Sequence, residues 1–389
     1  MRITDVTIDE FAYRFEDVAT EGGRLTYSPG SQAEQPGFVL TIRTADGTEG
    51  QYRGGMIVQP MITQIEMAAR SYLVGRDPLE RERIWQDVWR AHRHTDHFGL
   101  GPIDVALWDL AGRHYGESVS ALLGGYRESI PAYASTYFGN EDDAGGLDGP
   151  DAYAAFAETC AADGYPGFKI HPIGEAALDV DIVHAVGDAV GDDLDLMLDP
   201  ADAYGTYADA LRVGRALDEE GFLWYEDPMT GSGESLHLAR RLKDRLDTPL
   251  LGGEHARSGP IGTANALATD VFEYVRADVH LDGGITGAMK IAAIAEGFGV
   301  DVEFHGGGPA TVHCLSAIRN TNYFEHALLH PQFEEKNAQG LTADVDRPDP
   351  DGRVRVPTGP GLGVDIDREF LAERRTVRTV IDEDGVHDE

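Results

Sequence analysis

The chain has 389 residues, of which 42% are hydrophobic, and its 68 acidic residues outnumber 32 basic ones, which gives a formal net charge of −36. This length and hydrophobic fraction suit a globular protein of two or three domains, although a parallel barrel can use about 250 residues as one unit. So negative a charge repels phosphates, which argues against nucleic acid or an anionic membrane surface as a partner.

The amino terminus, MRITDVTIDEFAYRFEDV, has no basic segment followed by an apolar one, so we expect no signal peptide. No uninterrupted apolar run reaches about 18 residues, so no membrane span is expected either. We interpret the only cysteines, Cys160 and Cys314, as buried free thiols of a protein in a reducing cytoplasm.

Lysine is rare among the basic residues. It occurs only at positions 169, 243, 290 and 336, and arginine supplies all the others. A surface rich in Asp and Glu and nearly free of Lys suits a protein kept soluble in concentrated salt, where charge repulsion is screened over about 3 Å at 1 M. The composition therefore indicates a halophilic source.

Residues 1–118 predict an α+β domain. Two alternating strands, RITDVTI near the start and FVLTIRT at 38–44, are joined by a Gly- and Ser-rich segment, 21–37, that we interpret as a loop. Apolar residues at helical spacing then predict helices over 60–92 and 102–116.

Residues 119–345 have a different pattern, in which short apolar runs alternate with helical segments. Continuous apolar strands separated by helices favour a parallel sheet that is covered by helices, and eight strands is the number that closes a β/α barrel. A doubly wound open sheet is the alternative, but no Gly-rich turn follows an early strand, as a dinucleotide site would require. The predicted strands are 130–137, 167–172, 194–200, 222–228, 249–255, 274–279, 300–306 and 321–326, and the predicted helices include 151–164, 176–189, 206–220, 234–245 and 284–297. Residues 346–389, which are rich in turn formers at their start, are interpreted as a C-terminal segment that runs back over the surface.

Nearly every predicted barrel strand ends in an ionisable residue. Because the carboxyl ends of barrel strands share one rim, these side chains are expected to meet at one mouth, where barrel enzymes carry their catalytic groups. The residues are Lys169, His171, Asp199, Glu226, Glu254, Asp278, His305 and Glu325.

Three of these residues, Asp199, Glu226 and Glu254, are carboxylates on consecutive strands. Without a cation they would repel one another, and an all-oxygen ligand set with open positions suits Mg²⁺ better than zinc. The metal would polarise an oxygen of a bound carboxylate substrate and stabilise the dianion formed when the neighbouring carbon loses its proton.

The other residues of the rim are candidates for moving protons. Lys169 and His171 are two apart on one strand and so point to the same side, where Lys169 could reach a substrate carboxylate and His171 its α-carbon. Asp278 and His305 come from adjacent strands, and a carboxylate beside an imidazole fixes its tautomer and makes it a better base.

These motifs resemble, over almost the whole chain, the mandelate racemase-like branch of the enolase superfamily. The resemblance rests on ALWDLAGRHYGESVSALLGG at 106–125, WYEDP at 224–228, LLGGEH at 250–255, the segment 276–306 and VPTGPGLGVDID at 356–367. It implies an N-terminal capping domain, a modified (β/α)₇β barrel and abstraction of a proton α to a carboxylate. It also implies one Mg²⁺ per subunit on the three carboxylates, acid/base roles for His305 with Asp278, a substrate-carboxylate contact from Glu325, and a homo-oligomer, often of eight subunits.

The chain departs from the family pattern at two positions. The racemase pattern has a second lysine where this chain has His171, so the rule for which face loses its proton does not transfer. The dehydratases with an extra histidine two residues after the first metal ligand are not matched either, because Ala201 is there.

Two further groups of residues were considered. His92, His94 and His97 in HRHTDH could form a second metal site, but His92 does not share a helical face with the other two. Tyr27 and Arg53 belong to the predicted cap, whose loops close over the substrate in this family, and could contact its distal end.

The preferred function is a Mg²⁺-dependent dehydratase that converts a small-molecule carboxylate, an aldonate or aldarate, into a 2-keto-3-deoxy acid. Two imidazoles suit a step that needs both a base and an acid. Epimerisation or lactone cycloisomerisation uses the same enolate chemistry and is one alternative, and a non-catalytic binding protein on the same fold is another.

Overall fold

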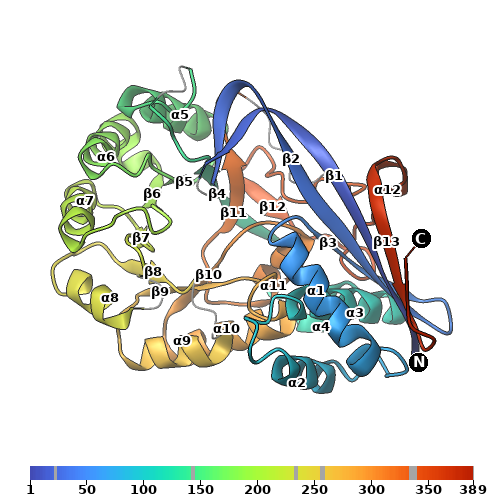
Figure 1. The fold of residues 1–389 in the computed structure, drawn as a ribbon. Coiled ribbons are helices and arrows are strands. Elements are labelled where there is room, and N and C mark those ends of the chain that lie inside the picture. Colours follow the sequence, from blue (N-terminus) through green and yellow to red (C-terminus); the bar gives the residue numbers. More distant parts are fainter. Residues whose placement is uncertain (22–23, 142–144, 232–234, 255–258, 333–339, 389) are drawn as a thin grey trace.

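The computed structural model describes residues 1–21, 24–141, 145–231, 235–254, 259–332 and 340–388 (Figure 1). Strands from both ends of the chain form one antiparallel sheet, and the middle of the chain forms a ring of parallel strands with helices outside it. The sheet and the helices that follow it are called the cap below. Over the part of the chain described, no helix is both long and apolar enough to cross a membrane.

The cap sheet combines the first and last strands of the chain, in the order β14-β13-β1-β2-β3. Its strands are β1 (Ile3–Glu21), β2 (Arg24–Thr44), β3 (Glu49–Gly54), β13 (Arg375–Ile381) and β14 (Val386–Asp388). Its helices are α1 (Val58–Ala68), the π-helical turn η1 (Ala69–Leu73), α2 (Arg81–Ala91) and α3 (Leu100–Tyr115). Helix α3 lies directly on β3, because a Cβ on Gly50 would come within 2.1 Å of the Ala106 carbonyl oxygen.

Two expectations for the cap need correction. The predicted loop at 21–37 is wrong at residue 21, which ends β1, and over residues 24–37, which belong to β2. The two strands pair here from Phe11↔Gly37 to Glu21↔Arg24, with a register shift between Glu16 and Val18, and residues 22–23 lie outside the described residues. Backbone pairing with the alternating strand β1 outweighs the Gly and Ser content of this segment. The helical stretch at 60–92 is interrupted after Leu73, where Gly75 adopts a φ of 81° before Pro78.

The second sheet is the predicted parallel barrel, and its strands follow the order β10-β9-β8-β7-β6-β5-β4-β11. Each predicted strand overlaps an observed one: β4 (Ser129–Thr136), β5 (Gly167–Ile170), β6 (Asp195–Leu198), β7 (Trp224–Glu226), β8 (Leu250–Gly252), β9 (Tyr274–Ala277), β10 (Asp301–Phe304) and β11 (Phe324–Leu329). A short strand, β12 (Arg353–Arg355), pairs antiparallel with β4. This near-closed, mostly parallel sheet with an N-terminal cap confirms the predicted fold class.

Helices cover the outside of the barrel (Figure 1). They are α4 (Val119–Leu123), α5 (Pro150–Ala162), α6 (Ala176–Val190), the 3₁₀ turn η2 (Gly191–Asp193), α7 (Tyr207–Glu220), α8 (Leu236–Lys243), α9 (Gly259–Ala268), α10 (Gly284–Phe298) and α11 (Pro309–Ala317). Cys160 on α5 and Cys314 on α11 are buried free thiols, as expected.

Cap and barrel share one hydrophobic core, in which α3 packs against α10. Two hydrogen bonds join these helices: the Trp108 indole N–H donates to the Thr286 hydroxyl (3.0 Å), and the Thr286 backbone N–H donates to the buried Asp104 carboxylate (2.8 Å). The cap is thereby fixed to the barrel.

The C-terminal segment returns to the cap across α3. The Leu362 backbone N–H donates to the buried carboxylate of Asp109 (2.8 Å), and a short helix, α12 (Arg368–Arg374), then leads into β13. Strand β13 pairs with β1 from Val6↔Ile381 to Phe11↔Arg375. The domain boundaries at 118 and 345 remain predictions.

Candidate active site

Three carboxylates gather at the carboxyl ends of neighbouring barrel strands. Asp199 follows β6, Glu226 ends β7 and Glu254 comes two residues after β8. One oxygen of each lies within 4.8 Å of an oxygen of each of the others. Asp199 and Glu226 are buried, and 15% of the Glu254 side chain is exposed. The structure therefore brings together the three residues predicted as metal ligands.

Lys169 contacts two of these carboxylates and is fully buried. Its ammonium group is 3.2 Å from Asp199 Oδ2, 3.1 Å from Glu226 Oε2 and 2.6 Å from Glu325 Oε1. Burial alone would lower the pKa of Lys169, but the Glu226 and Glu325 carboxylates outweigh it and hold that pKa well above its usual value. Lys169 is therefore a permanent positive charge at the barrel mouth.

Glu325 is the second residue of β11 rather than the last. Besides Lys169, its oxygens accept hydrogen bonds from the Ser135 hydroxyl (3.0 Å) and from the Gly306 backbone N–H (3.0 Å). Burial opposes its ionisation, but Lys169 and Arg276 lower the pKa of its carboxyl group far below the usual range. In this arrangement Glu325 orients Lys169, and its contact with a substrate stays a prediction.

His171 flanks the carboxylates on the Asp199 side. Its Nδ1–H donates to the Thr136 carbonyl (2.6 Å), and its backbone N–H donates to the Thr136 hydroxyl (2.9 Å). These bonds orient Nε2 toward Asp199 Oδ2, at 3.1 Å. The imidazole therefore presents Nε2 to the mouth of the barrel.

His305 flanks the same carboxylates on the Glu254 side. Its Nδ1 is 2.7 Å from Asp278 Oδ2, and its Nε2 is 3.5 Å from Glu254 Oε1. Burial alone would lower the pKa of His305, but the Glu254 and Asp278 carboxylates outweigh it and raise the pKa to about 10. The predicted Asp–His pair is formed, and two imidazoles lie at opposite ends of the carboxylate group.

These donors fit a hard divalent cation. Lys169 and Arg276 offset only part of the charge of the carboxylates. A further carboxylate, that of Asp227 next to Glu226, is 1% exposed, and neither of its oxygens has a hydrogen-bond partner among the described residues. Burial, and then the charges of Glu254 and Glu226, raise the pKa of Asp227 well above its usual value. Buried carboxylates crowded in this way, with oxygen atoms as the ligands on offer, suit Mg²⁺, which prefers such ligands.

The residues considered for substrate contact lie in the cap. The Tyr27 ring packs on His330 with ring centroids 4.6 Å apart. The Arg53 guanidinium donates to the Tyr13 hydroxyl (3.3 Å), and its charge contributes to lowering the pKa of His280, after the larger effect of burial. Their contact with substrate stays a prediction.

His92 and His97 are buried, whereas His94 is exposed. The His97 ring stacks on Trp89, with centroids 3.8 Å apart. Among the described residues, the only group of three or more acidic, His or Cys side chains close enough to hold an ion is the carboxylate triad. The structure thus does not bring the three histidines together as a metal site.

Sequence reasoning missed Arg276, Asp227 and the pair formed by Tyr52 and His280. The Tyr52 hydroxyl lies 2.8 Å from His280 Nδ1, and the His280 backbone N–H donates to Asp278 Oδ1 (2.5 Å). This contact links cap strand β3 to the Asp–His pair. Arg276 carried a signal, because it precedes Asp278 by two residues in the predicted strand 274–279, where such residues point to the same side.

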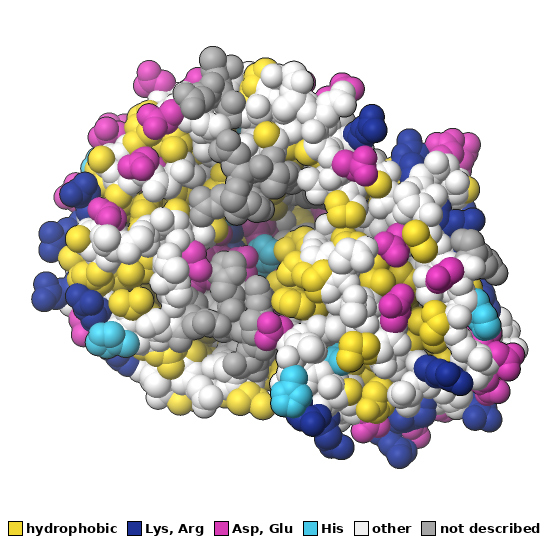
Figure 2. All heavy atoms as spheres, viewed as in Figure 1, with side chains coloured by type: hydrophobic (Ala, Val, Ile, Leu, Met, Phe, Trp, Pro, Cys, Tyr) yellow, Lys and Arg dark blue, Asp and Glu magenta, His cyan; other side chains and the backbone are white. Residues whose placement is uncertain are grey.

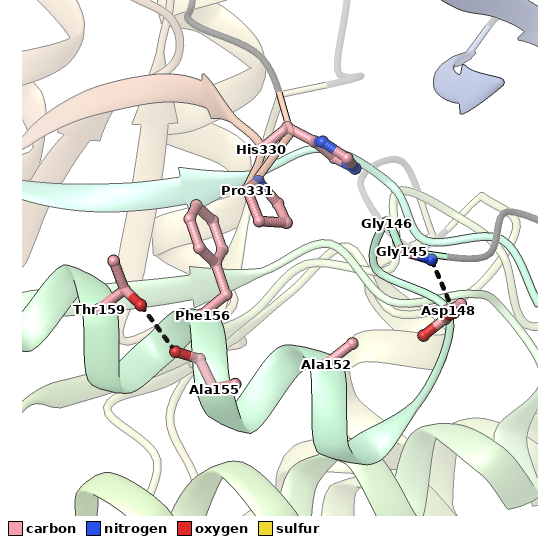
Figure 3. A pocket seen from close by; sticks show the side chains of 9 residues that line it. All are labelled: Gly145, Gly146, Asp148, Ala152, Ala155, Phe156, Thr159, His330 and Pro331. Atoms are coloured by element: carbon pink, nitrogen blue, oxygen red, sulfur yellow. Dashed lines mark hydrogen bonds between the residues drawn. The ribbon is translucent and has the colours of Figure 1, made fainter. Parts of the chain in front are cut away.

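The molecule is hollowed between the barrel helices and the cap, and acidic and histidine side chains are visible inside this hollow (Figure 2). A separate groove of about 410 Å³ lies beside α5, where Phe156 and Pro331 face each other (Figure 3). None of the three carboxylates lines that groove. The chemistry therefore belongs to the hollow and not to the groove.

Two family models cover most of the chain. Residues 152–370 match the enolase C-terminal domain-like family, and residues 12–124 match the mandelate racemase / muconate lactonizing enzyme N-terminal domain family. The first match includes all eight ionisable residues of the barrel mouth.

Several relatives have names that give a sugar acid or a sugar-acid lactone as the substrate. D-galactarolactone cycloisomerase of Agrobacterium fabrum is 30% identical over 365 residues, covering 87% of this chain and 90% of that enzyme. D-gluconate dehydratase of Thermoproteus tenax is 28% identical over 376 residues, covering 90% of this chain and 72% of that enzyme. The crystal structure of D-glucarate dehydratase from Agrobacterium tumefaciens complexed with magnesium is 36% identical, with a TM-score of 0.89, and covers 97% of this chain and 99% of that one. The chain belongs to the enolase superfamily, in its mandelate racemase and muconate lactonizing enzyme branch.

Proposed function

We propose that this protein is a Mg²⁺-dependent dehydratase of a sugar acid, an aldonate or aldarate, which yields a 2-keto-3-deoxy acid. The observation that carries the proposal is the pair of imidazoles, His171 and His305, at the two ends of the carboxylate triad. Loss of water from a 2,3-dihydroxy acid needs a base for the α-proton and an acid for the departing hydroxyl. Sugar-acid dehydratases among the relatives support the same reaction.

Asp199, Glu226 and Glu254 would hold the metal. Mg²⁺, when bound there, supplies positive charge that stabilises the dianion formed as the α-proton leaves. Lys169 adds a fixed positive charge for the substrate carboxylate. One imidazole takes the α-proton, and the other gives a proton to the 3-hydroxyl group, which leaves as water. The resulting enol then becomes the 2-keto acid.

Asp278 prepares His305 for its step. Its Oδ2 forms a hydrogen bond with Nδ1 of the His305 ring. Its Oδ1 accepts hydrogen bonds from the backbone N–H groups of His280 (2.5 Å) and Leu281 (3.1 Å). The carboxylate is thus fixed on both sides and holds the His305 ring with Nε2 toward the carboxylate triad.

The test is a semicarbazide assay for 2-keto acids, run on a panel of aldonates and aldarates with Mg²⁺ in molar KCl. We expect the wild-type protein to form keto acid from at least one sugar acid. The His305→Asn variant should form it at less than about a tenth of the wild-type rate. Exchange of the α-proton in D₂O without keto acid would refute dehydration, and no exchange with any acid of the panel would favour a binding protein.

Cycloisomerisation of a sugar lactone is the second candidate, because D-galactarolactone cycloisomerase is 30% identical to this chain. It uses the same α-proton chemistry but releases no water. Mass spectrometry of a galactarolactone incubation separates the two, since the isomer keeps the mass of its substrate and a dehydration product does not.

We also propose that the protein works as a homo-oligomer in a salt-rich cytoplasm. Its net charge is −36. Two of its few lysines form ion pairs with acidic side chains: Lys243 with Asp270 and Glu273, and Lys290 with Glu82. Sedimentation in molar KCl would give the oligomeric state.

A further inference from the structure

Arg276, on β9, is 1% exposed and lies inside the barrel mouth. Its Nε–H donates to Glu226 Oε1 (2.5 Å), and one Nη2–H donates to Glu226 Oε2 (2.7 Å). Its remaining contacts fix the plane of the guanidinium: Nη1 donates to the Phe304 carbonyl (3.0 Å) and Nη2 to the Tyr133 hydroxyl (3.1 Å). A buried, two-point pair of this kind is rigid.

This pairing uses most of the acceptor capacity of Glu226. A carboxylate has about four lone-pair positions, two on each oxygen. Arg276 occupies one lone-pair position on each oxygen. The Lys169 ammonium group, 3.1 Å from Oε2, occupies the second position on that oxygen. One position, on Oε1, is left for any further partner. Glu226 can therefore make one bond to a metal ion and not two.

Mg²⁺ and Ca²⁺ differ in how they are coordinated by a carboxylate. Mg²⁺ takes about six oxygens in a tight octahedron, whereas Ca²⁺ takes about six to eight and commonly binds both oxygens of a carboxylate. We propose that Arg276 is a positioning residue that limits Glu226 to one-oxygen ligation and thereby makes the site select Mg²⁺ against Ca²⁺. This inference rests on the proposed function, because it uses the same metal site.

The test is titration calorimetry of the full-length protein, freed of metal with EDTA and dialysed into molar KCl. MgCl₂ and CaCl₂ are titrated separately, and the readout is the ratio of the Ca²⁺ to the Mg²⁺ dissociation constant, which does not depend on catalysis. The variants are Arg276→Lys, which keeps the charge but offers no two-point fork, and Arg276→Gln, which removes the charge. The matched control is Arg113→Lys, because Arg113 pairs with Asp109 and Asp365 outside the barrel mouth.

We expect both Arg276 variants to lower the ratio by about tenfold or more, while Arg113→Lys leaves it unchanged. If only Arg276→Lys folds, as judged by circular dichroism, that variant decides. A ratio within roughly threefold of wild type in each folded variant would overturn the role of Arg276 and leave the proposed function standing. Absence of Mg²⁺ binding to the wild-type protein would instead overturn the metal site of the proposed function, and the inference with it.

Discussion

Replacing Asp278 with Asn tests the part of the site that moves the proton. The change keeps the size of the side chain but removes the charge 2.7 Å from His305 Nδ1. The new side chain would accept the backbone hydrogen bonds of residues 280 and 281 through its oxygen, so its amide group would face Nδ1 and donate to it. His305 would then carry its proton on Nε2. This prediction takes His305 as the imidazole that accepts the α-proton, and in that tautomer Nε2 has no free lone pair for it.

The size of the effect follows from the pKa of His305. A rise from the ordinary 6.5 to about 10 corresponds to roughly 5 kcal/mol in favour of the protonated ring. Asp278 supplies a charge-assisted hydrogen bond to this ring, and the loss of such a bond costs about 1.5–3 kcal/mol, which is up to about 10²-fold in rate. The wrong tautomer adds to this, since the same change behind a serine-protease histidine costs about 10⁴-fold in kcat. We expect a fall between about 10²- and 10⁴-fold.

The assay is the rate of α-proton exchange in D₂O, followed by proton NMR with the substrate that the panel identifies. The pH at which the rate changes should also move down, because a charge that raises the pKa of His305 has been removed. Asp104→Asn is the matched control: Asp104 is a buried carboxylate that accepts from the Thr286 backbone N–H (2.8 Å) where α3 meets α10, outside the ring of barrel strands, and its loss should affect stability only. Exchange by Asp278→Asn within about tenfold of wild type, with Mg²⁺ affinity unchanged, would show that the reasoning is wrong.

Three further predictions concern metal binding and stability. Glu226→Gln should weaken Mg²⁺ binding by about tenfold or more in calorimetry, because a charged ligand is lost, and an unchanged affinity would argue against Glu226 as a ligand. Burial raises the pKa of Asp104 to about 7 in the folded protein, above its ordinary 3.8, so ionising it costs stability as pH rises from about 4 to 7. The free energy of unfolding of Asp104→Asn, relative to wild type, should therefore increase by about 4 kcal/mol between pH 4 and pH 8 in urea titrations, and a difference that is constant with pH would contradict this. Finally, Tm measured by calorimetry should rise by several degrees or more from dilute buffer to molar KCl, since salt screens a net charge of −36, and equal Tm values would count against a halophilic protein.

The barrel could be predicted because its signals are local. Runs such as LDLMLDP at 194–200 and FLWYEDP at 222–228 are apolar and end in a carboxylate, so one pattern marks both the strand and its functional end. The observed strands β6 and β7 stop at Leu198 and Glu226, at the predicted rim. The positions of Asp199 and Glu226 in the triad follow from this alone.

What could not be predicted depends on partners far away in the chain. The spacing of Arg276 from Asp278 indicates the side to which it points but not its partner, Glu226, which is 50 residues away. The segment 24–37 resembles a loop in composition, and only its pairing with β1 makes it a strand. The link from Tyr52 to His280 joins residues 228 apart. Such contacts are set by tertiary structure and not by local propensity.

The pairing of β1 with β13 affects how the chain folds during synthesis. The two strands join residues near position 6 to residues near position 381, so β1 receives one of its neighbours only after all the barrel strands between them have been made. Until then, one long edge of β1 offers unpaired N–H and C=O groups to other nascent chains. A premature stop just before β13 would spare the whole barrel mouth yet leave that edge exposed, so aggregation rather than inactivity would be its first consequence.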